Sequence, residues 1–116
     1  MRPQMLILTL TLAACSGTEA PDTSGDFVPF ADLEITQDII GKWSRSCALC
    51  HVQGEGGAPR LGDRDDWQEW LAQGENQLLT HAIQGYNRMP ALGYCMACEL
   101  DDLRALIKLM ATGDAS

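Results

Sequence analysis

The residues best suited to covalent chemistry in this chain lie at positions 47–51. Cys47 and Cys50 stand two residues apart, and His51 follows directly. A C-x-x-C-H sequence is a haem-attachment signal, because each thiol can add to one vinyl group of a porphyrin and form a thioether. The adjacent imidazole then lies beneath the iron, where it can bind as the proximal ligand. These residues predict one covalently bound haem c.

Two further groups are needed to complete such a site. The second ring nitrogen of His51 needs an acceptor that fixes its tautomer, and the Pro59 carbonyl is the natural candidate. For the sixth position of the iron the candidate is Met89, which stands in a loop, where Pro90 restricts the backbone of the residue before it. Methionine sulfur raises the reduction potential and favours the ferrous state, which suits an electron carrier.

The other methionines of the domain and its second histidine are not expected to bind the iron. Met96 and Met110 are predicted to fill the core, as single methionines commonly do. His81 lies on the helix expected before the methionine loop, and packing or a surface position is predicted for it.

A second pair, Cys95 and Cys98, has the same spacing, but Glu99 stands where a histidine would be needed for another haem. A disulfide is favoured because the chain carries an export signal. A redox-active dithiol is a second possibility, although no βαβ pattern surrounds it. Zinc bound by both C-x-x-C pairs is a third, and the long separation between the pairs disfavours it.

The first fourteen residues are typical of a signal peptide. Arg2 precedes an apolar run at 5–12 that is too short to span a bilayer. Residues 12–15, Leu-Ala-Ala-Cys, resemble a bacterial lipobox, which implies cleavage before Cys15 and attachment of lipid there. An ordinary signal peptide with a chance cysteine is the alternative. Ser16, rather than aspartate, implies no retention at the inner membrane, so the outer membrane is favoured.

The charge of the chain constrains its partners. The formal net charge is −8, and removal of Arg2 with the leader makes it −9. Nucleic acid is therefore not expected, because its phosphates require a basic surface. An acidic redox protein that meets basic surfaces on its partners fits the charge, and so does a simple need for solubility.

The remaining chain predicts one small all-α domain. Residues 15–32 are rich in small and acidic residues and predict a lipidated flexible tether. Near its end are three apolar residues that can dock on the domain, Phe27, Val28 and Phe30. Residues 33–116 form the predicted domain. Helical periodicity and end signals predict four helices, with loops at 52–63 and 86–98. The predicted helices are 32–48, 65–73, 75–84 and 99–111.

Taken together, these motifs resemble a class I c-type cytochrome, nearest to the cytochrome c5 group. The residues that carry the likeness are Trp43, Cys47, Cys50, His51, the run 57–63, Trp67, the run 85–90, Gly93, Cys95 and Cys98. The resemblance implies about four helices around one haem c, axial ligation by His51 and Met89, and a disulfide between Cys95 and Cys98. Trp43 replaces a more usual Tyr or Phe. Glu99 replaces a frequent Ser, which predicts a weaker helix cap.

The function expected is single-electron transfer between respiratory-chain partners, without a substrate at the iron and without enzymatic activity. Its expected place is the periplasmic or extracellular side of a membrane. The alternative is a five-coordinate haem c enzyme or gas sensor, which would require that Met89 does not ligate. The Met89 loop offers no obvious acid–base pair for such an enzyme.

Overall fold

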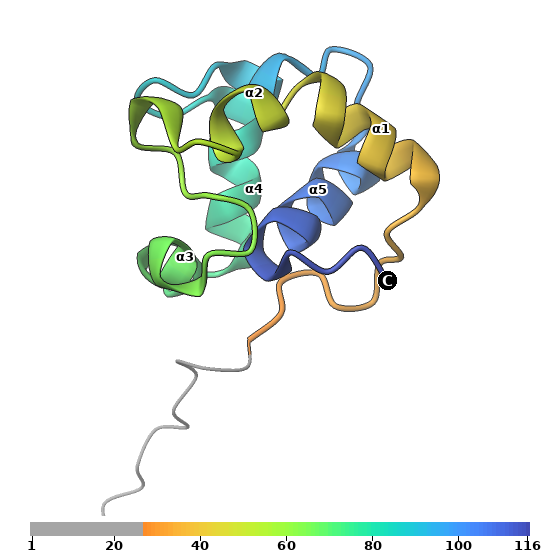
Figure 1. The fold of residues 1–116 in the computed structure, drawn as a ribbon, viewed down its shortest axis with the longest axis horizontal. Coiled ribbons are helices and arrows are strands. Elements are labelled where there is room, and N and C mark those ends of the chain that lie inside the picture. Colours follow the sequence, from red (N-terminus) through yellow and green to blue (C-terminus); the bar gives the residue numbers. More distant parts are fainter. Residues whose placement is uncertain (1–26) are drawn as a thin grey trace, which may run out of the picture.

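The computed structural model describes residues 27–116, so the predicted signal peptide, Cys15 and most of the predicted tether lie outside the described residues. Within that range the fold is all-helical, and its only strand-like feature is an isolated bridge between Tyr86 and Met89. Short 3₁₀ turns lie at Glu55–Gly57 and Ala91–Tyr94. The α-helices are α1 (Gln37–Arg45), α2 (Ala48–His51), α3 (Arg64–Leu71), α4 (Glu75–Gln84) and α5 (Leu100–Thr112) (Figure 1).

The predicted first helix, 32–48, is wrong at its start and is interrupted near its end. It begins only at Gln37, because the Thr36 hydroxyl accepts a hydrogen bond from the Ile39 N–H and caps the first turn. It stops at Ser46, whose backbone leaves the helical region and whose hydroxyl donates to the Lys42 carbonyl at 2.6 Å. A separate short helix, α2, then carries Cys50 and His51.

The later helices match the predictions closely, and local signals explain their ends. The Asp63 carboxylate accepts from the Asp66 N–H at the start of α3. Gly113 adopts a left-handed conformation and ends α5. At the start of α5, where Glu99 predicts a weaker cap than Ser, the Glu99 N–H donates to the Asp102 carboxylate at 2.8 Å, as in a capping box.

The helices pack around α5. Helices α1, α3 and α4 each contact it, and Figure 1 shows α1 crossing it near its N-terminal half. Leu106 is 1% exposed, and six other residues of α5 are buried with it. In residues 27–116 no helix has the length and apolar character that a membrane crossing requires.

The segment before α1 is packed onto the domain. Pro29 and Phe30 are buried, and the Phe30 N–H donates to the Glu75 carboxylate at 2.8 Å. The Lys108 ammonium donates to the carbonyls of Ala31 and Leu33. The packed structure thus begins before residue 33, and Phe30 docks on the domain as its apolar character predicts.

Candidate functional site

A cavity of about 330 Å³ opens beside α2 and is walled almost entirely by apolar groups. All the residues predicted to attach or ligate a haem line this single space. Its wall includes Cys47, Cys50, His51, Pro59, Trp67, Trp70, Leu78, His81, Ala82, Met89, Ile107 and Met110. The fold therefore brings together residues from α2, α3, α4, α5 and two loops.

One of the two ring nitrogens of His51 is engaged in a hydrogen bond. Its Nδ1 lies 2.7 Å from the Pro59 carbonyl oxygen, which can only accept, so Nδ1 carries the proton and Nε2 keeps its lone pair. The ring is buried and stacks on Trp67 with centroids 6.0 Å apart. Burial lowers the pKa of His51, although the bond to Pro59 acts in the other direction. The side chain is thus a neutral imidazole with a nitrogen available for a metal.

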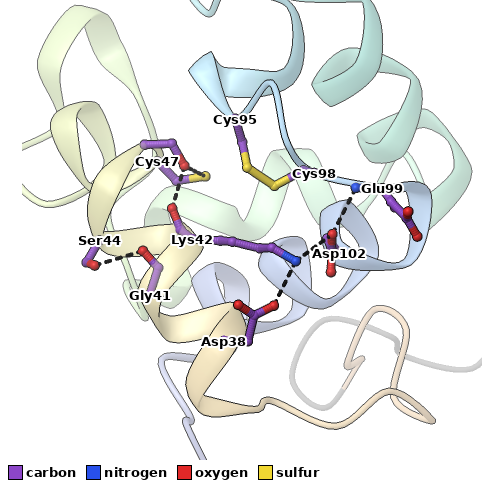
Figure 2. The surroundings of a disulfide bond; sticks show 10 residues. Asp38, Gly41, Lys42, Ser44, Cys47, Cys95, Cys98, Glu99 and Asp102 are labelled. Carbon is purple, nitrogen blue, oxygen red and sulfur yellow. Dashed lines mark hydrogen bonds and ion pairs between the residues drawn. A yellow bond between two sulfur atoms is a disulfide. The ribbon is translucent and has the colours of Figure 1, made fainter.

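The two attachment cysteines lie at the same cavity, and neither takes part in a disulfide. Cys47 is buried, and its Sγ lies 3.6 Å from the Ser46 hydroxyl oxygen. Burial raises the pKa of the Cys47 thiol. By contrast, Cys95 and Cys98 are bonded to each other, with Cα atoms 5.3 Å apart, between the 91–94 turn and α5 (Figure 2).

Met89 reaches the cavity from the loop after α4. The loop is tight, since Tyr86 and Met89 exchange two backbone hydrogen bonds of 3.0 and 2.8 Å. A β-carbon at Gly93 would lie 3.5 Å from Met89 Cε and 3.9 Å from Cys47 Sγ. The thioether tip of Met89 and one attachment sulfur are therefore both close to the same backbone position.

Met110, Met96 and His81 differ in their burial and in their contacts. Met110 is buried and lines the cavity. Met96 is 79% exposed, so the expectation that it fills the core is wrong; it lies within the small ring that the Cys95–Cys98 disulfide closes. His81 is half-buried on the cavity wall, stacked on Tyr86 at 4.1 Å, and its Nε2 lies 2.9 Å from Gln77 Nε2.

Sequence patterns did not reveal the whole wall. Trp70 and Tyr86, whose rings pack edge to face at 5.6 Å, and Ile107 all border the cavity. Ile107 belongs to the apolar stripe of the last helix, a pattern that predicts burial without saying what lies above it.

The set of groups fits a covalently bound haem. Two thiols, a neutral imidazole and a methionine thioether surround one apolar cavity. Thiols, an imidazole and a thioether are the kinds of group with which proteins attach haem c and bind its iron. The geometry thus defines the class of site, a c-type haem pocket.

Residues 36–110 match the family profile described as cytochrome c oxidase, cbb3-type, subunit III. The match covers more than half of the chain and includes both cysteine pairs, His51 and Met89. The chain therefore belongs to this family of c-type cytochrome domains.

Individual relatives show which kinds of cytochrome this chain resembles. The chain is 41% identical over 76 residues to cytochrome c5 of Ectopseudomonas mendocina, covering 64% of this chain and 84% of that relative. It is 44% identical over 55 residues to cytochrome c-555 of Chlorobaculum tepidum, covering 44% of this chain and 51% of that relative. A chain from the crystal structure of the electron transfer complex of nitrite reductase with cytochrome c superposes with a TM-score of 0.61. That chain is 32% identical, and the match covers 67% of this chain and 95% of the other.

These findings give the protein its function at the level of the family. It is a monohaem electron-transfer cytochrome close to cytochrome c5, and it carries haem c at Cys47 and Cys50. Membership of this family also supports the prediction that the protein is exported.

Proposed function

We propose that His51 and Met89 are the axial ligands of the haem iron, and that the protein carries single electrons between redox proteins outside the cytoplasm. One observation carries this proposal. Cys47, Cys50, His51 and Met89 all line one apolar cavity. When bound, the haem supplies an iron that alternates between the ferric and ferrous states.

The chain's own residues prepare that site. The Pro59 carbonyl accepts a hydrogen bond from Nδ1–H of His51 and so keeps the proton on that nitrogen. The lone pair of Nε2 is then available to bind the iron. The wall of the cavity is mostly apolar, and a methionine ligand favours the ferrous state. The proposal is therefore a carrier whose iron has no open position for a substrate.

Redox proteins with basic docking surfaces are the proposed partners. The similar solved chain comes from an electron transfer complex of nitrite reductase with cytochrome c, which supports partners of this class. The formal charge of −8 favours a basic counterpart. Exposed Leu49 and Val52 flank the attachment site and Tyr94 lies at the cavity, which supports an apolar contact there.

We also propose that the mature chain begins at Cys15 and is anchored there by lipid, with the outer membrane favoured. The lipobox-like residues 12–15 and the following Ser16 support this. Because Pro29 and Phe30 are packed on the domain, the proposed tether shortens from 15–32 to residues 15–28. About 14 residues of flexible chain span roughly 19–22 Å, which lifts a small domain off the bilayer.

Substitution Met89→Ala tests the ligation. The ferric holoprotein of the parent should show the weak near-infrared band of methionine-bound haem, and the variant should lose it. The reduction potential should fall by on the order of 0.1–0.3 V, within the range that axial ligands span. Met96→Ala is the matched control, because Met96 is exposed, and it should change neither quantity. A parent without the band would favour the five-coordinate enzyme or sensor.

A further inference from the structure

Three consecutive residues behind Met89 have a left-handed backbone. The φ angles are 61° at Leu92, 56° at Gly93 and 65° at Tyr94. Only the glycine adopts this region freely, because in other residues the β-carbon approaches the following carbonyl oxygen. Such conformations persist where the surrounding structure imposes them, and they gather at functional sites.

Both ends of this segment are held. At the near end, the Gly93 N–H donates to the Pro90 carbonyl at 3.0 Å. At the far end, the Cys95 N–H donates to the Leu92 carbonyl at 2.9 Å. Cys95 is 7% exposed and is bonded to Cys98.

The disulfide connects the segment to the most firmly packed helix. Cys98 lies two residues before α5, which begins at Leu100. There the Asp102 carboxylate accepts from the Glu99 N–H and pairs with the Lys42 ammonium at 2.8 Å (Figure 2). The covalent link therefore ties a strained turn to the crossing of α1 and α5.

The position of the turn bears directly on the cavity. Gly93 is the backbone position near which Met89 Cε and Cys47 Sγ meet, at 3.5 and 3.9 Å from its β-carbon site. On the other side of the loop, a β-carbon at Gly85 would lie only 2.8 Å from the Met89 carbonyl oxygen. The Met89 loop is thus enclosed between Gly85 and the left-handed turn, and a shift of that turn moves the wall behind the thioether.

We propose that the Cys95–Cys98 disulfide and the left-handed turn 92–94 are a positioning device for the Met89 thioether. The disulfide keeps the turn in its strained form, and the turn keeps the thioether at the cavity. Without this clamp the turn relaxes, and the fraction of molecules with Met89 at the iron falls. This inference rests on the proposed ligation by Met89.

A pair of substitutions at Tyr94 isolates the backbone conformation. The Tyr94 side chain is 63% exposed, and Tyr94→Val and Tyr94→Gly both remove its ring. Valine strongly disfavours a positive φ, whereas glycine accepts it. In the ferric holoprotein, Tyr94→Val should lose most of the near-infrared methionine band and have a lower reduction potential than Tyr94→Gly. Equal bands and equal potentials in the two variants would overturn the role of the turn.

The double substitution Cys95→Ala with Cys98→Ala tests the clamp. Well below its unfolding temperature, this holoprotein should lose most of the band and show a lower potential. Met96→Leu, inside the same ring, should keep both. A double variant that is less stable but retains the parent's band and potential would show a merely structural disulfide and overturn the inference. If the double variant does not retain haem, the Tyr94 pair decides.

The two proposals can fail separately. A parent without the methionine band overturns the ligation and, with it, the positioning role. A parent with the band, whose disulfide and turn variants are unchanged, overturns the positioning role alone.

Discussion

At the scale of single residues, the neutral state of His51 comes from its neighbours. Burial lowers its pKa, and the Pro59 carbonyl fixes which nitrogen carries the proton. Two backbone contacts hold the loop that supplies Pro59. The Leu61 N–H donates to the His51 carbonyl at 2.8 Å, and the Gly62 N–H donates to the Met110 carbonyl at 2.7 Å. The geometry of the imidazole therefore depends on how closely this loop approaches α5.

Substitution Gly62→Ala should reveal that close approach. Gly62 has a φ of 69°, and a β-carbon there would lie 3.1 Å from the Gly113 Cα. The left-handed conformation and the crowded backbone together predict a loss of about 2–4 kcal/mol in the free energy of unfolding, measured by urea denaturation of the holoprotein. Gly54→Ala is the control, because that position is also left-handed but its nearest neighbours lie at 3.4 Å. Equal losses would mean that backbone crowding contributes nothing.

At the scale of elements, the crossing of α1 and α5 is reinforced by one shared ammonium. Lys42 pairs with Asp38 on its own helix at 2.7 Å and with Asp102 on α5 at 2.8 Å (Figure 2). Asp102 also accepts from the Glu99 N–H and so partners the start of its helix. One carboxylate thus joins two helices and stabilises a helix end.

Substitution Asp102→Asn should weaken this junction in a pH-dependent way. The hydrogen bond from Lys42, helped by that from Glu99, lowers the pKa of Asp102 below its ordinary value of 3.8. The ionised group therefore stabilises the fold above that value, and the benefit is lost as the pH falls through the lower pKa of the folded state. At pH 7 the variant should lose roughly 1 kcal/mol.

The direction of this pH dependence is tested by measuring the free energy of unfolding as a function of pH. Between about pH 5 and pH 3 the parent should lose stability more steeply than Asp102→Asn. Asp38→Asn is the matched control, because Asp38 is 68% exposed and pairs only within α1, and it should cost about 0.3 kcal/mol. Parallel pH profiles for the parent and Asp102→Asn would contradict the assignment.

At the scale of the whole molecule, the packed segment at 29–33 fixes where the chain leaves the domain. Phe30 is bound at the start of α4 through Glu75, and Lys108 binds the carbonyls that follow it. Helix α4 runs from this point to the Met89 loop, a length of about 15 Å for its ten residues. The proposed tether therefore leaves the domain at the end of α4 remote from Met89.

Substitution Cys15→Ser should release the protein from the membrane. The parent, expressed with its leader, should sediment with membranes, because several acyl chains bind stably where one binds only marginally. The variant should appear in the soluble extracytoplasmic fraction with its haem intact. Ser16→Asp should keep the lipid and move the protein to the inner membrane in a density gradient. A parent found wholly in the soluble fraction would refute the anchor.

Local signals in the sequence were sufficient for much of the fold and for the attachment site. Cys47, Cys50 and His51 act through fixed spacing along one short stretch, and haem attachment depends on that spacing. Pro90 marks Met89 for the same local reason. The bounds of α4 and α5 follow from apolar periodicity and glycine ends, which are also properties of neighbouring residues.

The tertiary structure decided what depends on residues distant in the chain. It interrupted the predicted first helix at Ser46, where Cys47 must turn to the cavity, and it buried Phe30 against α4. It brought Gly62 against Gly113 and placed Gly93 between Met89 and Cys47. The sequence alone determined which groups can bind a haem. Their arrangement required the fold, because close backbone approach and left-handed strain arise only when distant segments pack together.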